Sequence, residues 1–246
     1  MRLRVRYSKL GKVRFLSHRD LARVWERGLR RAGVRVAYSE GFSPRPRLSF
    51  GLALSTGYES LGEYLDIDLH AGEAVSAEEL PALVTPALPP GIVAQVATPL
   101  APGSDSLQAA VTSSSWLLDL PGVTLHAATA AVEQAVAAPE LPIAVERKGT
   151  TSTIDARPAI LALALSNAPA AAGSEGATVA AELATQPRSL RPAELIRALD
   201  PTWVESRVLR THQWTSTDGA RSEPIPFGEP GAAAATSVAH ASERAS

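Results

Sequence analysis

Residues 18–33 constrain the fold most, because their apolar residues recur at helical spacing along one side. Ser17 is a residue type favoured at a helix N-cap, Asp20 resembles the partner position of a capping box, and Gly33 is a typical stop. At 100° per residue, apolar and cationic residues fall on opposite arcs. The apolar arc holds Leu21, Val24, Trp25, Gly28, Leu29 and Ala32, and the cationic arc holds Arg19, Arg23, Arg27 and Arg30. We predict a helix that packs through one side and presents a row of guanidinium groups on the other.

The segment 41–50 adds two more arginines between prolines. Proline fixes its own φ and pushes the preceding residue towards an extended conformation, so Arg45 and Arg47 should project from a stiff, non-helical segment. Arginine suits bidentate phosphate contact, and the rings of Tyr38, Phe42 and Phe50 could stack on a base. The alternative is that these rings belong to the core and the arginines form a solvated face.

Charge is distributed unevenly along the chain. The first fifty of the 246 residues hold 14 Lys and Arg against 3 Asp and Glu, whereas the rest holds 10 against 22. Such a basic region is typical of a surface that binds a polyanion. The alternative is that the two regions neutralise each other across an interface.

The composition excludes several classes of chemistry. There is no cysteine, which rules out disulfides, thiolate metal sites and a catalytic thiol in this chain. Neither a GxxxxGK[ST] loop nor GxGxxG occurs. No apolar run approaches the roughly 20 residues of a membrane span, and the arginine-rich start lacks the apolar region of a signal peptide. We expect a cytoplasmic protein without a membrane association, a metal or another cofactor.

The order of expected elements predicts an α+β fold. The first part reads as strand, helix, two strands, helix and strand, which is the ferredoxin-like βαββαβ order. These elements are expected at 2–7, 18–33, 34–39, 63–69, 76–85 and 92–96. After a turn-rich segment, strands and helices recur at 116–120, 125–137, 143–148, 151–156, 160–165, 177–183, 191–199 and 204–210. We predict two tandem ferredoxin-like domains at 1–98 and 111–214, a linker at 99–110 and a disordered tail at 215–246.

Three motifs, at residues 15–21, 38–50 and 62–66, together resemble a bacterial family of domains of unknown function. The family is described as radical-SAM-linked, and its members occur alone or joined to a B12-binding radical SAM protein. The resemblance is dense over 1–98 and looser over 111–214. It implies a stand-alone member whose partner could be a radical SAM enzyme. Members are often encoded near ribonuclease E/G and ribosomal-protein genes, which implies ribonuclease E/G as another possible partner.

These observations favour an RNA-binding accessory protein that acts on tRNA or rRNA with a separate modifying or processing enzyme. The expected contacts are Arg14, Arg19, Arg23, Arg27, Arg30, Phe42, Arg45 and Arg47. Whether the chain catalyses a reaction, and its oligomeric state, stay open at this point.

Two alternatives come from other classes of function. His18 is the single histidine of the first fifty residues, and the positive end of a helix dipole would favour its neutral form as a base. With Tyr38 it could form a metal-independent endoribonuclease site, as in the tandem ferredoxin-like nucleases that process CRISPR repeats. The other alternative is an adaptor whose basic face docks on an acidic protein. Asp66 and Asp68 share a strand face, but two carboxylates alone are more typical of a solvated edge than of a metal site.

Overall fold

The computed structural model describes residues 1–147, 149–166, 175–217 and 219–225. The described chain has a mixed α+β fold with five α-helices and a mostly antiparallel sheet, as the α+β prediction requires. Lys148 of the predicted hairpin and residues 218 and 226–246 of the predicted tail lie outside the described residues.

The elements of the first half follow the predicted order. They are β1 (Arg2–Lys9), η1 (Gly11–Phe15), α1 (His18–Arg31), β2 (Leu48–Phe50), β3 (Glu59–Asp68), α2 (Leu80–Val84), η2 (Thr85–Ala87) and β4 (Ile92–Pro99). Residues 34–39, predicted as a strand, form only isolated bridges, between Val36 and Leu69 and between Tyr38 and Pro46. The extended pairing with β3 is instead made by β2.

The second half contributes the remaining elements. They are α3 (Leu107–Ala110), β5 (Val111–Pro121), α4 (Leu125–Ala137), β6 (Pro142–Arg147), β7 (Thr150–Asp155), η3 (Arg157–Ala159), β8 (Ile160–Leu165), β9 (Gly176–Ala184), α5 (Pro192–Leu199), β10 (Arg207–Thr217) and β11 (Ala220–Ser222). The predicted helix 125–137 and strand 160–165 match α4 and β8 residue for residue.

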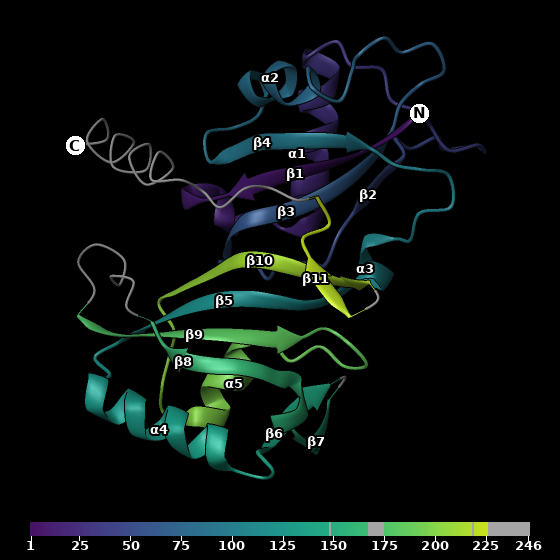
Figure 1. Ribbon diagram of the computed structural model, residues 1–246. Helices are drawn as coiled ribbons and strands as arrows, with labels where there is room; N and C mark the ends of the chain where they lie inside the picture. The colour runs from purple at the N-terminus through teal and green to yellow at the C-terminus, as the bar shows by residue number, and fades with distance from the viewer. Residues whose placement is uncertain (148, 167–174, 218, 226–246) are drawn as a thin grey trace.

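One sheet runs through both halves in the order β4-β1-β3-β10-β5-β9-β8 (Figure 1). β2 also pairs with β3, β11 pairs with β10, and β6 and β7 form a separate hairpin. The halves are joined where β10 runs parallel to the start of β3, with Leu209 opposite Glu59 and Arg210 opposite Ser60. The other strand pairs are antiparallel.

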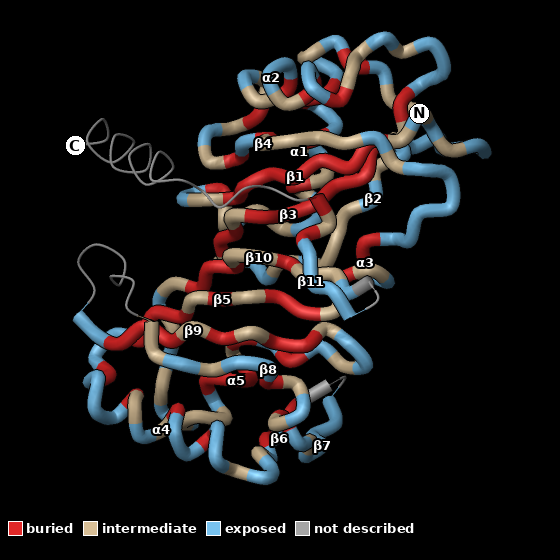
Figure 2. The backbone as a smooth tube through the Cα atoms, in the orientation of Figure 1, coloured by how far each residue is buried: buried red, intermediate tan, exposed pale blue. Residues whose placement is uncertain are grey.

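Each half nevertheless has its own apolar cluster. In the first half, α1 and α2 cover the face of β1 and β3 that carries Leu3, Val5 and Leu65. In the second, α4 and α5 cover a cluster that includes Leu118 and Val179. Figure 2 shows buried residues along the central strands of both halves. The predicted domain boundaries stay a prediction, because the clusters are separate but the sheet is shared.

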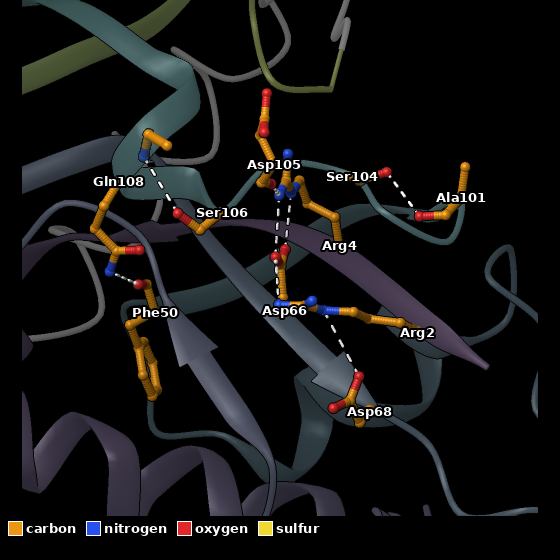
Figure 3. A network of polar contacts seen from close by, with 11 residues as sticks. Arg2, Arg4, Phe50, Asp66, Asp68, Ala101, Ser104, Asp105, Ser106 and Gln108 are labelled. Atoms are coloured by element: carbon orange, nitrogen blue, oxygen red, sulfur yellow. Dashed lines mark hydrogen bonds and ion pairs between the residues drawn. The ribbon is translucent and has the colours of Figure 1, made fainter.

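The opposite face of β1 and β3 is buried as well, although its side chains are charged. Arg4 donates to both carboxylate oxygens of Asp66 at 2.7 and 3.0 Å and to the carbonyl of Asp105 at 3.1 Å. Arg2 reaches Asp66 at 3.2 Å and Asp68 at 3.6 Å (Figure 3). The arginines that alternate along β1 therefore contribute little to a polyanion-binding surface. Part of the basic region is therefore neutralised within the first half itself, by Asp66 and Asp68.

The predicted linker and the first part of the predicted tail both pack. Leu107 of α3 is buried against Tyr64, and Gln108 donates to the carbonyl of Phe50 at 2.7 Å. Beyond Trp214, β10 continues to Thr217, β11 pairs with it, and Ile225 joins Leu107 in a small cluster. The described residues of the predicted tail up to Ile225 therefore pack against the fold instead of being disordered, and the polar sequence at the end of β10 gave no signal of a strand.

Candidate nucleic-acid interface

Helix α1 is held in one orientation by its cap and its apolar side. The Ser17 hydroxyl accepts a hydrogen bond from the backbone N–H of Asp20 at 3.2 Å and donates to its carboxylate at 2.7 Å, as the predicted N-cap requires. Trp25 and Leu29 are buried, and the Trp25 ring meets Tyr7 edge-to-face at 5.0 Å. A Cβ on Gly28 would lie 2.7 Å from Leu88, so this position lets α1 approach η2 closely.

The exposed side of α1 forms one wall of an open groove of about 610 Å³. The opposite wall comes from residues 33–38, with Pro46 and His70 beside it. Three predicted contact residues of α1 line it together with the alternative candidate Tyr38, namely Arg23, Arg27 and Arg30. The structure thus brings part of the helix and a ring from the following segment into one concave surface.

The charge of this groove is predominantly positive. Arg23 pairs with Asp20 at 3.3 Å on the exposed surface, where such a pair contributes little. In the part of the chain that the structure describes, Arg27 and Arg30 make no ion pair, and both are exposed. Glu26 is the carboxylate that lines the groove. Two guanidinium groups therefore retain their donors for a ligand.

The proline–arginine segment is a turn fixed by backbone hydrogen bonds. Ser39 donates its N–H to the carbonyl of Arg45 at 2.9 Å, and its hydroxyl accepts from the N–H of Arg45 at 3.0 Å. The N–H of Arg47 binds the carbonyl of Ala37 at 2.8 Å. Arg45, Arg47 and Phe42 are exposed, with Phe42 fully so. The segment is non-helical as predicted, but these three side chains do not line the groove of α1.

Two other predicted contacts also lie elsewhere. Arg19 is exposed on α1 outside the groove, and Arg14 lies 3.7 Å from Glu59 with its guanidinium over the ring of Phe15. The predicted set therefore divides into a helix groove, an exposed turn and two separate arginines.

His18 and Tyr38 do not share a hollow. The His18 ring meets Phe50 edge-to-face at 5.3 Å and lines hollows on the β2 side of α1, whereas Tyr38 lines the groove on its arginine side. The geometry gives no support to their pairing as an acid and a base. Among the described residues, no group of three or more His, Asp or Glu side chains could hold a metal ion.

Arg35 and His70 complete the groove, although they were absent from the predicted set. Glu73 holds Arg35 by accepting from its N–H at 2.9 Å and from Nε at 3.1 Å. The first of these hydrogen bonds is the main cause that lowers the pKa of Glu73. The position of Arg35 in the apolar run 34–38 was the available signal, since an arginine there must turn away from the core.

Replacing Glu73 with Gln should make the free energy of unfolding depend less on pH between acid and neutral conditions. A carboxylate whose pKa is lowered by folding stabilises the fold above its ordinary pKa, and this contribution is lost as pH falls through the folded-state pKa. The difference in the free energy of unfolding between the wild type and Glu73→Gln should therefore be larger at neutral pH than under acid conditions. Urea unfolding at both pH values measures it, and a difference that grows on acidification would contradict the assigned role of Glu73.

Among the helices of the described residues, none combines the length and the apolar character that a membrane span requires.

The fold and the groove define an α+β protein that presents an arginine-lined helix beside a proline–arginine turn. A family model described as "Uncharacterized protein conserved in bacteria (DUF2344)" matches residues 2–192. The chain belongs to this family. The matched region includes α1, the groove and the sheet through β9, and ends at the start of α5. No curated protein matches the chain in sequence.

Proposed function

We propose that the protein binds structured RNA, tRNA or rRNA, through the α1 groove, and acts as an accessory to a separate RNA-modifying or processing enzyme. The observation that carries the proposal is the pair of exposed groove arginines, Arg27 and Arg30, which have no ion-pair partner among the described residues. Arg2, Arg4 and Arg6 of the same basic region are instead held by carboxylates, as Arg4 is by Asp66.

The geometry of α1 fits a phosphate backbone. From Arg23 to Arg30 the helix advances by about 10 Å at roughly 1.5 Å per residue, which is long enough to contact more than one phosphate. Each guanidinium presents a planar fork of donors suited to phosphate oxygens. The ring of Tyr38 in the same groove offers a surface for base stacking, and the exposed Phe42, Arg45 and Arg47 offer a second contact on the adjacent turn.

We interpret the two halves as tandem ferredoxin-like units fused edge to edge. Within the first half the strand order is β4-β1-β3-β2, and within the second it is β10-β5-β9-β8. If the strands of each half are numbered in chain order, with the β6–β7 hairpin treated as an insertion, the spatial order of the strands in both halves is fourth, first, third, second. This order supports the interpretation as two ferredoxin-like units. The helices pack on one face of the sheet, which leaves the α1 groove accessible at the outer surface.

The partner enzyme is proposed from the family resemblance. A radical SAM enzyme or ribonuclease E/G would act on the RNA that this protein presents. The adaptor alternative makes the same surface dock on an acidic protein.

Single alanine variants of Arg27 and Arg30 should each weaken RNA binding and reduce its salt dependence. Each lost phosphate contact should lower the magnitude of the slope of log affinity against log salt by about 0.7–0.9. Filter binding or anisotropy with total tRNA and with rRNA fragments, over a range of salt concentrations, measures both effects. Arg197→Ala is the matched control, because Arg197 is an exposed arginine on α5 of the other half.

Three outcomes would contradict the proposal. If wild-type protein binds neither RNA, the function is wrong, and capture of an acidic protein through Arg27 and Arg30 would favour the adaptor. If the groove variants bind like Arg197→Ala, the surface is misplaced. Specific RNA fragments that disappear in His18→Ala would establish the nuclease alternative instead.

A further inference from the structure

A second hollow, of about 520 Å³, lies where the two halves meet. Residues 52–58 of the first half form one side, and the middle of β5, the end of β9 and the start of α5 form the other. Its volume is within the usual range of small-molecule sites, about 300–1,000 Å³. It is distinct from the α1 groove, since the two share no lining residue.

A polar atom that lines this hollow, and another on the neighbouring strand β10, lack hydrogen-bond partners among the described residues. Ser114 is 2% exposed and lines the hollow, and its hydroxyl has no hydrogen-bond partner within the described ranges. Gln213 lies directly opposite Ser114 in the β5–β10 pairing, is fully buried, and has an unpartnered side-chain carbonyl. A buried polar group without a hydrogen bond costs roughly 1–3 kcal/mol. A ligand group with N–H or O–H donors would remove this cost.

Aromatic rings border the same hollow. Tyr58 and Trp116 meet edge-to-face at 6.2 Å, and the Arg210 guanidinium lies 5.2 Å from the centroid of Trp116. Tyr58 is fixed from its other end, because its hydroxyl donates to Glu205 at 3.2 Å. A flat ring with hydrogen-bonding edges fits such a wall better than an aliphatic ligand does.

The charge of the hollow favours an anionic ligand. Among the described residues, no carboxylate lines it, and the cations that line it are Arg191 and Arg210. Glu63 neutralises Arg210 through contacts of 2.6 and 2.7 Å, so Arg210 supplies little net charge. Arg191, at the N-terminal end of α5, is exposed and makes no ion pair among the residues described. A phosphate would find its counter-charge there.

We infer that the hollow binds one nucleotide unit, with the base towards Ser114 and the phosphate towards Arg191. The unit is either a free nucleoside monophosphate or a single unstacked residue of an RNA, and the second source rests on the proposed function. In that case the α1 groove holds the RNA backbone while the hollow between the halves selects a base.

Two variants test the inference. Ser114→Ala removes the unpartnered hydroxyl together with the cost of burying it, so the melting temperature should rise while nucleotide affinity falls about threefold to tenfold. Arg191→Gln should weaken binding about tenfold or more, because it removes a charge-assisted contact. Ser113→Ala and Arg197→Ala are the matched controls, since Ser113 already donates to Glu182 at 2.6 Å and Arg197 does not line the hollow.

Equilibrium dialysis with AMP, GMP, CMP and UMP, and anisotropy with a labelled RNA, distinguish the sources. Monophosphate binding that falls in both variants supports a free nucleotide. RNA binding that falls in both variants, without monophosphate binding, supports an unstacked residue.

RNA binding that falls in Arg27→Ala but not in Ser114→Ala or Arg191→Gln, without monophosphate binding, overturns the inference and leaves the proposed function intact. Absence of any binding overturns both. A lower melting temperature of Ser114→Ala with unchanged affinity shows that Ser114 bonds Gln213 in solution, which also overturns it.

Discussion

Replacing Glu63 with Gln is expected to lower the free energy of unfolding by about 3–5 kcal/mol, the usual cost of removing one partner of a buried ion pair. Glu63 accepts from Arg210 Nε at 2.9 Å and from Nη2 at 2.6 and 2.7 Å. Both side chains are almost completely buried, at 6% and 2% exposure. Gln keeps the shape of Glu but leaves the guanidinium without a counter-charge in the join between the two halves.

Lys9 makes this loss larger than a single pair would suggest. Its ammonium group is buried and donates to the carbonyls of Arg14 and Leu16, each at 3.2 Å. Burial lowers the pKa of Lys9, and the negative charge of Glu63 partly opposes that effect. Without the charge of Glu63, two buried cations would face each other.

Urea unfolding of three variants tests this account. The double replacement Glu63→Leu with Arg210→Met removes both charges and should recover most of the lost stability, because an apolar pair carries no desolvation penalty. Arg23→Gln disrupts an exposed pair and should cost less than about 1 kcal/mol. A free energy of unfolding for Glu63→Gln within about 1 kcal/mol of the wild-type value would contradict this account. It would mean that water reaches the ion pair between the halves, whereas the structure buries it.

Short-range sequence signals were sufficient to predict the elements that are determined by nearby residues of the chain. Helix α1 was predicted because Ser17, the apolar spacing and Gly33 agree, and its arginine side is exposed as the projection requires. Ser76 and Glu79, at the start of the predicted helix 76–85, likewise exchange the two hydrogen bonds of a capping box at 3.1 and 3.2 Å. The helix itself is shorter than predicted and begins at Leu80, and Pro86 lies in η2 rather than in a longer α-helix.

Features set by distant parts of the chain could not be predicted in this way. Apolar and cationic residues alternate over the predicted strand 2–7, a pattern typical of a strand covered on one face, yet Arg6 on the other face is buried by Glu223, which lies 217 positions away. The parallel contact between β3 and β10 involves only two residue pairs and leaves no pattern in either strand. The lining of the α1 groove was predicted only in part for the same reason. Arg35 and His70 line it because the His70 N–H binds the carbonyl of Arg35, and the residue spacing along α1 gives no sign of that contact.

A chain that ends at Trp214 is expected to be less stable than one that ends at Ile225 by about 3 kcal/mol or more. Residues 215–225 supply β11 and bury Ile225 against Tyr64 and Leu107. Full burial of one such side chain contributes roughly 1.5–3 kcal/mol. The shorter chain also lacks Glu223, whose carboxylate accepts from the Tyr64 hydroxyl at 3.2 Å.

The loss of Glu223 adds an electrostatic cost, because its carboxylate lies 3.5 Å from the buried Arg6 guanidinium. Differential scanning calorimetry of the two truncated chains should show a lower melting temperature for the shorter one, by roughly 2–4 °C per kcal/mol. Two variants within the longer chain separate the causes: Ile225→Ala removes the apolar contact, and Glu223→Gln removes the charge. Equal melting temperatures for the two truncated chains would mean that the end of the described chain does not cover the Arg6 side of the sheet.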